Sequence, residues 1–238
     1  MNRYRGDSGG VSLGGSLSTA VKLLVAWNVI FYLVQMLAGR FVRGADLAIL
    51  FNLGLVPSDL FHGRIWQLVT YMFLHGSLFH IAFNMLALWM FGSQLEFVWG
   101  ARRFVQYYLF TGIGAGITNA IFEPHSAIPI VGASGAIYGL LLAYGMYFPN
   151  RQILIYFLFP MKAKYFVIFF GAIEFLASIT PGRDGVAHLA HLGGLLFGFL
   201  YLKRIPMRWF GRRRSTRGRG NVIDIRSHRD RDDNSRWS

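Results

Sequence analysis

A serine and a histidine lie far apart in this sequence, each in an otherwise apolar stretch. Ser134 lies in the run Gly132-Ala-Ser-Gly135, ahead of an apolar segment that ends near Phe148, and His191 lies in the run His188-Leu-Ala-His-Leu-Gly-Gly194. A hydroxyl and an imidazole are the nucleophile and the base of acyl-transfer chemistry. Ionisable and polar groups inside apolar spans are costly, which makes them candidates for function. The pair therefore points to acyl chemistry inside a lipid bilayer.

The residues around Ser134 favour a tight turn that opens a helix. Gly132 and Gly135 flank the serine and Pro129 precedes it, a composition that breaks a preceding helix. At the amino end of the next helix, free N–H groups and the helix dipole would favour an oxyanion. A plain N-cap is the alternative, and Gly-x-Ser-Gly taken alone favours that alternative. Because position 136 is Ala, the Gly-x-Ser-x-Gly turn of α/β hydrolases is absent.

Glycines near His191 predict a close helix–helix contact. Gly194 and Gly198 follow it by three and seven residues, and so lie near its face of a helix. The helix after the serine offers a matching pair, Gly135 and Gly139, and small residues at this spacing let two helices approach closely. We expect this packing to bring the imidazole to the serine. The alternative is a histidine that only bridges helices by hydrogen bonding.

Other side chains bear on the choice of base. Tyr138, one turn after the serine, is expected to hold the imidazole of His191 by stacking, whereas His188 is a rival base one turn earlier. No carboxylate is evidently placed to orient either histidine, because Asp184 belongs to a loop and Glu174 to another span. A two-residue Ser–His dyad is therefore the simpler interpretation.

A third polar group has the donors of an oxyanion hole. His80 and Asn84 are four residues apart, share a helix face and can both donate hydrogen bonds. A zinc site is the alternative, but Ile81 stands where the His-Glu-x-x-His motif has Glu, and no metal is expected. His75 lies off that face and is expected to cap or brace the loop entrance. A polar brace between helices is the other interpretation for all three.

Composition predicts the elements that must position these residues. Hydrophobic residues make up 54% of the 238 and charged residues 15%, against about 25% charged in soluble domains. Long apolar runs predict an all-α polytopic membrane protein, since helices satisfy their own backbone in lipid. Cysteine is absent, which excludes disulfides and thiolate chemistry. Six spans are expected, at residues 21–38, 78–97, 104–122, 134–148, 165–179 and 186–202. The connection 39–77 is long enough to have its own structure.

The distribution of Lys and Arg predicts orientation. An even number of spans puts both termini on one side, and the excess of Lys and Arg there predicts that this side is the cytoplasm. Residues 203–238 hold 12 Lys and Arg against 4 Asp and Glu, a basic tail that follows the last span. We interpret it as a cytoplasmic anchor rather than a segment that binds nucleic acid or anionic lipid, and no nucleic-acid partner is expected. The chain thus divides into a cytoplasmic segment 1–20, a six-helix membrane domain 21–202 and the tail 203–238.

These motifs together resemble the rhomboid family of intramembrane serine proteases. The resemblance rests on the order His75-x4-His80-x3-Asn84, then Gly132-x-Ser134-Gly135, then Ala190-His191-x2-Gly194-x3-Gly198, and it covers roughly residues 55–202. It also includes Trp66, Glu96 and the run Trp99-Gly-Ala-Arg-Arg103. Many relatives carry Trp-Arg where this chain has Trp66-Gln67. This difference is expected to affect loop packing or lipid contacts rather than the chemistry.

The resemblance implies roles for the candidate residues. Ser134 would be the nucleophile and His191 the base, with His80, Asn84 and the Ser134 backbone N–H forming the oxyanion hole. Gly132 would line the turn and Tyr138 would support the His191 ring. No metal or cofactor would be needed. Glu174 would lie on a helix that borders the substrate entrance, either as a gate or as a hydrogen-bond partner of a neighbouring helix.

The function implied is intramembrane endopeptidase activity on transmembrane segments of membrane proteins within the lipid bilayer. Two alternatives stay open: a catalytically silent rhomboid-like protein that binds or escorts membrane proteins, and a small transporter whose broken fourth helix lines a substrate site. The compact six-span plan, with no evident organelle transit segment, predicts a bacterial plasma membrane as the location.

Overall fold

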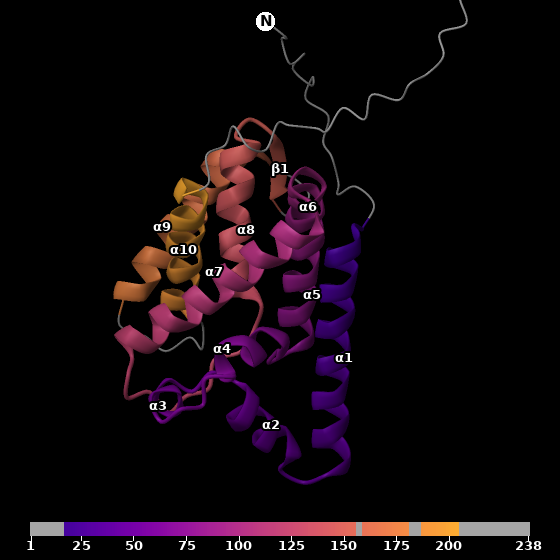
Figure 1. The fold of residues 1–238 in the computed structure, drawn as a ribbon, viewed down its shortest axis with the longest axis vertical. Coiled ribbons are helices and arrows are strands. Elements are labelled where there is room, and N and C mark those ends of the chain that lie inside the picture. Colours follow the sequence, from indigo (N-terminus) through magenta and orange to yellow (C-terminus); the bar gives the residue numbers. More distant parts are fainter. Residues whose placement is uncertain (1–16, 156–158, 181–186, 205–238) are drawn as a thin grey trace, which may run out of the picture.

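The computed structural model describes residues 17–155, 159–180 and 187–204, which form a bundle of helices (Figure 1). One long helix runs without a break through α5, the π-helical turn η2 and α6. The other long helices are α1, α7, α8, α9 and α10. The bounds are α1 (Thr19–Phe41), α5 (Leu78–Ala87), η2 (Leu88–Gly92), α6 (Ser93–Trp99), α7 (Ala101–Phe122), α8 (Ser134–Tyr147), α9 (Ala163–Ile179) and α10 (His188–Arg204).

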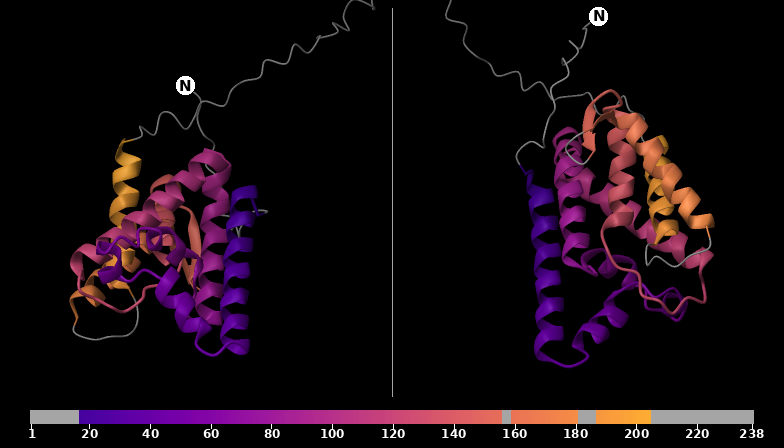
Figure 2. Two further views of the ribbon diagram at one scale, coloured as in Figure 1. Left: turned by 60° about the horizontal axis from the view of Figure 1, so that its bottom comes forward. Right: turned by 180° about the vertical axis from the view of Figure 1, so that it is seen from behind.

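These helices agree with the six apolar runs of the sequence to within three residues at either end. By length and hydropathy, Thr19–Phe41 and Leu78–Trp99 are each able to cross a membrane. The start of the sixth expected span at residue 186, most of the expected N-terminal segment 1–20 and the tail from residue 205 lie outside the described residues. Figures 1 and 2 show α1 beside α5 and α6 at one edge, α9 and α10 at the other, and α7 and α8 between them.

The outer faces of the described bundle are apolar. α1 buries four of its 23 residues, Ala20, Val21, Leu24 and Asn28. Large apolar side chains of α1 and α9 are exposed instead: Leu23, Trp27, Ile30, Leu33, Val34, Ile168, Phe169, Phe175 and Leu176. Apolar surface on this scale marks contact with lipid or with other proteins.

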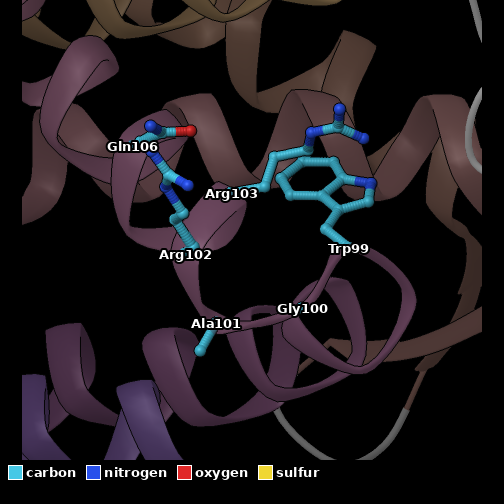
Figure 3. Close-up of a pocket in the computed structure, with 6 residues that line it drawn as sticks. All are labelled: Trp99, Gly100, Ala101, Arg102, Arg103 and Gln106. Carbon is cyan, nitrogen blue, oxygen red and sulfur yellow. The ribbon is translucent and has the colours of Figure 1, made fainter.

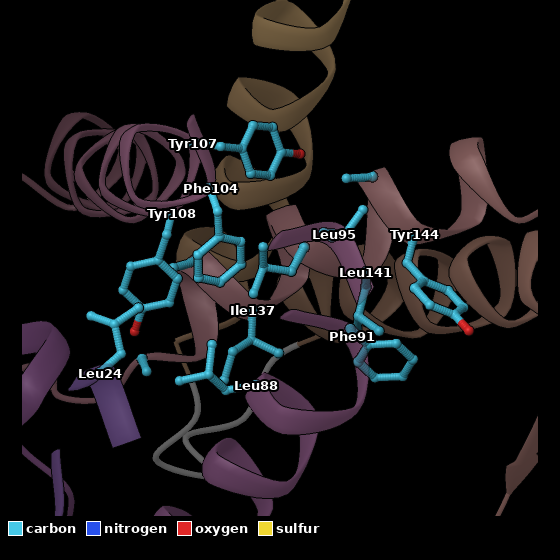
Figure 4. Packing of buried hydrophobic residues seen from close by; sticks show 14 of the residues in the cluster. Leu24, Leu88, Phe91, Leu95, Phe104, Tyr107, Tyr108, Ile137, Leu141 and Tyr144 are labelled. Atoms are coloured by element: carbon cyan, nitrogen blue, oxygen red, sulfur yellow. The ribbon is translucent and has the colours of Figure 1, made fainter. Parts of the chain in front are cut away.

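The interior is a single packed cluster to which α1, η2, α6, α7 and α8 all contribute. Figure 4 shows aromatic rings of α7 within it. Its labelled members are Leu24, Leu88, Phe91, Leu95, Phe104, Tyr107, Tyr108, Ile137, Leu141 and Tyr144. Two buried hydroxyls there are paired: Tyr107 Oη donates to the Gly139 carbonyl and Tyr71 Oη to the Gly112 carbonyl, each at 2.7 Å. Such buried polar groups are stable because they are paired.

The connection 39–77 has its own structure, as expected. It contains α2 (Ala45–Leu53), α3 (Pro57–Phe61), α4 (Gln67–Thr70) and the 3-10 turn η1 (Tyr71–Phe73). Gln67 is fully buried and fastens this region by two hydrogen bonds. Its Oε1 accepts from Val56 N at 3.0 Å, and its Nε2 donates to the Phe51 carbonyl at 3.0 Å. A reciprocal backbone bridge between Leu55 and Ile130 then joins this region to the chain just before α8.

One element was missing from the all-α prediction. After α8 the chain forms an antiparallel pair of strands, β1 (Gln152–Ile155) and β2 (Phe159–Lys162). The apolar residues after Arg151 are too few to form another span, and β-branched and aromatic residues favour strands. The described residues are thus mostly helical with one short hairpin.

Candidate active site

The turn before α8 fixes the position of Ser134. Gly132 has φ +122°, a conformation that favours glycine, and its N–H donates to the Tyr71 carbonyl at 2.9 Å. Ala133 is the N-cap residue and Ser134 is the first residue of the helix. The simple N-cap interpretation is therefore wrong, because Ala133 holds the N-cap position and the Ser134 hydroxyl contacts another helix.

His191 is that partner. Its Nε2 lies 2.7 Å from Ser134 Oγ, although 57 residues separate them in the sequence. The imidazole is buried, with 7% of the residue exposed. The Ser134 contact is thus made by His191 of α10, while the rival His188 contacts Glu174.

The predicted glycine packing of α8 against α10 is confirmed. A Cβ added at Gly194 would overlap the backbone carbonyl oxygen of Gly135. One added at Gly198 would lie 3.3 Å from the Gly139 Cα and 2.6 Å from Tyr107 Oη. The absence of these side chains lets the two backbones approach closely enough to bring the imidazole within reach of the hydroxyl.

Tyr138 lies against the imidazole, as the sequence led us to expect. Its ring centroid is 4.3 Å from that of His191 and the two planes differ by 16°. This stacked arrangement restricts rotation of the imidazole about its side-chain bonds. Tyr138 Oη also donates a hydrogen bond to the carboxylate of Glu174.

The expectation that no carboxylate is placed to orient the histidines is wrong. Glu174 Oε2 lies 2.6 Å from His188 Nδ1 and 3.0 Å from His191 Nδ1. The contact with His191 is close but poorly aligned as a hydrogen bond. Sequence spacing missed it because the rotation of α9 relative to α10 is a tertiary property. The sequence did contain one indication: Glu174 is the only acidic residue of α9, and an acidic residue in an apolar span is costly unless it has a partner.

Glu174, His188 and His191 are also the described residues that could hold a metal ion, since their ligand atoms all lie within 4.8 Å of one another. Ligands around a tetrahedral zinc ion would be separated by about 3.3 Å, given metal–ligand bonds near 2.0–2.2 Å. The carboxylate is closer than this to both histidines, at 2.6 and 3.0 Å. The geometry is that of direct contacts between the side chains.

Of the predicted oxyanion donors, His80 lies beside the same turn. A Cβ added at Gly132 would be 2.7 Å from His80 Nε2 and 3.7 Å from Ser134 Oγ, so the His80 ring faces the turn that carries the serine. Asn84 is buried, and its amide donates one N–H to the His80 carbonyl at 2.9 Å. One amide N–H is used in this way, and a second is available to a ligand.

His75 lies in the connection before α5, where its backbone rather than its ring is bonded to α1. Its backbone exchanges two hydrogen bonds with the Gln35 side chain of α1, at 3.3 and 3.4 Å. The ring is buried and lies edge-on to His80, with centroids 5.0 Å apart. Burial, with a smaller effect of His80, lowers the pKa of His75 to about 4. His75 is therefore neutral near pH 7.

Two pockets of the described residues are not lined by Ser134. One, of about 520 Å³, is lined by residues 99–103 and Gln106 where α6 meets α7 (Figure 3). The order of the helices places it at the end of the bundle opposite to Ser134. The other, of about 570 Å³, lies between α1 and the α2 region and reaches His75 and Gly76. The chemistry at Ser134 thus depends on the packed helices rather than on either pocket.

Apolar outer faces around an interior serine–histidine contact define a polytopic membrane protein with the reactive groups of a serine hydrolase. Residues 62–206 match the Rhomboid domain, and the chain belongs to the Rhomboid family. It is 30% identical to Rhomboid protease AarA of Providencia stuartii over 209 residues, which cover 79% of this chain and 72% of that protein.

Two other relatives match over a smaller share of their length. Rhomboid protein 1, mitochondrial, of Saccharomyces cerevisiae is 34% identical over 62% of this chain and 43% of its own. Rhomboid protease GluP of Bacillus subtilis is 36% identical over 58% of this chain and 25% of its own. The chain therefore spans less than half the length of these two relatives.

Proposed function

We propose that this chain is an intramembrane serine endopeptidase that cleaves transmembrane segments of other membrane proteins by a Ser–His mechanism. The observation that carries the proposal is the 2.7 Å contact of Ser134 Oγ with His191 Nε2 inside a bundle of this family. The names of AarA and GluP, both rhomboid proteases, support the reaction class.

In the proposed reaction His191 accepts the Ser134 hydroxyl proton at Nε2 as the oxygen attacks a peptide carbonyl. The resulting imidazolium gives this proton to the nitrogen of the leaving amine, so the C–N bond breaks and an acyl ester remains on Ser134. Water then repeats the sequence: His191 takes its proton, and the ester breaks to release a carboxylic acid and the free serine. Each transfer uses the nitrogen that already lies beside the hydroxyl.

The negative oxygen formed in each attack needs hydrogen-bond donors. We assign this role to the Ser134 backbone N–H, His80 and Asn84; the His80 ring beside the Gly132 turn and the bond from the Asn84 amide to the His80 carbonyl support the assignment. The Ser134 N–H belongs to the first turn of α8, where N–H groups lack partners within the helix. Removing one such donor typically lowers kcat by about 100- to 1,000-fold.

The same proposal includes a membrane arrangement. The long helix α5–η2–α6 and the helices α1, α7, α8, α9 and α10 would each cross the bilayer, which puts both termini on one side. The excess of Lys and Arg supports the cytoplasm as that side. Segment 1–20 and the basic tail 203–238 would then face the cytoplasm of a bacterial plasma membrane. The substrate would unwind locally to expose its peptide bond, and the mechanism uses no metal or cofactor.

A serine-directed fluorophosphonate tests the proposal. The detergent-purified protein and its Ser134→Ala variant are treated with the probe, and cleavage of a model transmembrane substrate is measured for both. We expect labelling and cleavage by the wild-type chain and neither by Ser134→Ala. Equal labelling of both, or a folded wild-type chain that cleaves nothing across a panel of single-span substrates, would favour the catalytically silent escort protein instead.

A further inference from the structure

Glu174 occupies the position of a third catalytic-site member. Ser134 Oγ lies 2.7 Å from Nε2 of the His191 ring, and Glu174 Oε2 lies 3.0 Å from Nδ1 of the same ring. The hydroxyl and the carboxylate therefore contact the two different nitrogens of one imidazole. We propose that Glu174 is a positioning residue that keeps His191 protonated at Nδ1 and stabilises the imidazolium formed during cleavage. This inference rests on the proposed protease function.

The carboxylate is itself held in place from two other helices. Tyr138 Oη of α8 donates to Glu174 Oε1, and His188 Nδ1 of α10 lies 2.6 Å from Glu174 Oε2. Glu174 is buried, with 6% of the residue exposed. A carboxylate with partners on both oxygens and little access to water has few alternative positions, so its charge stays beside the histidine.

The position of this charge selects one form of the imidazole. A neutral histidine carries its proton on one nitrogen and a lone pair on the other. A lone pair on Nδ1 would face the carboxylate at 3.0 Å and be repelled, whereas an N–H there is attracted even at an imperfect angle. With the proton on Nδ1, the lone pair lies on Nε2, the nitrogen beside Ser134. Only this form can accept the hydroxyl proton.

Tyr138 links the orientation of the ring to that of the carboxylate. Its ring stacks on His191 while its hydroxyl donates to Glu174. A rotation of the imidazole out of the plane of these contacts would break the stacking and move Nδ1 away from Oε2. The two partners of the imidazole, Ser134 Oγ at Nε2 and Glu174 Oε2 at Nδ1, thus lie at fixed positions on opposite sides of the ring.

A purely structural role for Glu174 predicts a different result from a positioning role. We propose Glu174→Gln, which keeps the shape and removes the charge, with Glu123→Gln as the matched control. Glu123 ends α7, contacts Asn119 and takes no part in the site. The other titratable groups around His191 are His80 of α5, Tyr138 of α8 and His188 of α10, and all stay unchanged in both variants.

For Glu174→Gln we expect kcat to fall by about 100-fold or more with KM within a few-fold, since a neutral partner no longer favours the active tautomer. Glu123→Gln should match the wild type in both kcat and KM. A folded Glu174→Gln enzyme with kcat within five-fold of wild type would overturn the proposal.

A measurement on the wild-type chain covers the case in which the variant does not fold. Nitrogen-15 NMR of labelled histidines at neutral pH reports which ring nitrogen carries the proton, and the His191 signals are assigned by their loss in His191→Gln. We expect a protonated Nδ1 and an unprotonated Nε2. The opposite tautomer would overturn the proposal. Absence of cleavage by the wild-type enzyme would instead refute the protease function itself, so the two failures are distinguishable.

Discussion

The contact between Gly194 and Gly135 makes the activity sensitive to a single methyl group. In a Gly194→Ala variant, the new Cβ would overlap the Gly135 carbonyl oxygen and lie 2.9 Å from the carbonyl carbon. Both atoms belong to the backbone of α8, so no rotamer change can relieve the overlap. The helices α8 and α10 must move apart by about 1 Å to restore ordinary van der Waals distances.

This displacement is transmitted directly to the contact between Ser134 and His191. His191 lies one turn before Gly194 on the same helix, and Ser134 lies one residue before Gly135. A shift of about 1 Å would stretch the 2.7 Å Ser134–His191 contact beyond hydrogen-bond distance. Misplacement of this size typically lowers a rate by about 100-fold, and overpacking a close contact destabilises by about 1–3 kcal/mol.

Gly171→Ala is the matched control. Gly171 lies on α9, and its added Cβ would meet only Leu195 Cδ1 at 3.4 Å, an ordinary contact. The assays are the initial rate of cleavage of a model transmembrane substrate and thermal unfolding in the same detergent. We expect Gly194→Ala to lose most of its activity and to unfold at a lower temperature, with Gly171→Ala close to wild type. A Gly194→Ala enzyme that is as stable and as active as wild type would refute the argument that close backbone packing positions the histidine.

Three further outcomes are expected. Gly132→Ala places a side chain at φ +122° and 2.7 Å from His80 Nε2, so fluorophosphonate labelling of Ser134 should slow by at least about 10-fold; labelling at the wild-type rate would contradict this. The Glu96 carboxylate accepts hydrogen bonds from the backbone N–H groups of Ala20 and Val21 at 3.0 Å and from the Ser18 hydroxyl. Glu96→Gln should therefore destabilise the folded protein by about 1–3 kcal/mol, measured by thermal unfolding. The kcat of the folded variant should be unchanged. His75 is neutral in the folded chain down to about pH 4 but binds a proton near pH 6.5 when unfolded, so stability should fall as the pH drops from 6.5 towards 4. In His75→Gln this fall should be smaller, and an identical pH dependence of the unfolding temperature in the two proteins would contradict the assignment.

The positions of the long helices followed from the sequence because lipid leaves few alternatives. Runs of apolar residues without alternating polarity can satisfy their backbone only as helices, and the ends of those runs agree with the ends of the helices. The contact of α8 with α10 was also predictable, because glycines at regular spacing on a helix face allow a second helix to approach closely. The four glycines are Gly135 and Gly139 on α8 and Gly194 and Gly198 on α10. A pattern within one helix is enough to identify the face that packs.

The position of Glu174 could not be predicted in the same way. Its distance from His191 depends on how far α9 is rotated and shifted relative to α10, and neither quantity is encoded by spacing within either helix. The hairpin β1–β2 was missed because a short run of apolar residues is compatible with either a strand or a short buried helix. Where two helices lack a pattern of small residues, their contacts could therefore be identified only from the structure.

The polar site is stable within an apolar bundle because its members satisfy one another. Ser134 pairs with His191, Tyr138 donates to Glu174, and Glu174 contacts both histidines. An isolated Glu174 in this position would be strongly unfavourable, and its partners would lose their own acceptor if it were replaced. The contacts that make burial tolerable are also those that fix the imidazole between hydroxyl and carboxylate. The side chains that provide partners for the buried Glu174 carboxylate are therefore the same ones that surround the histidine.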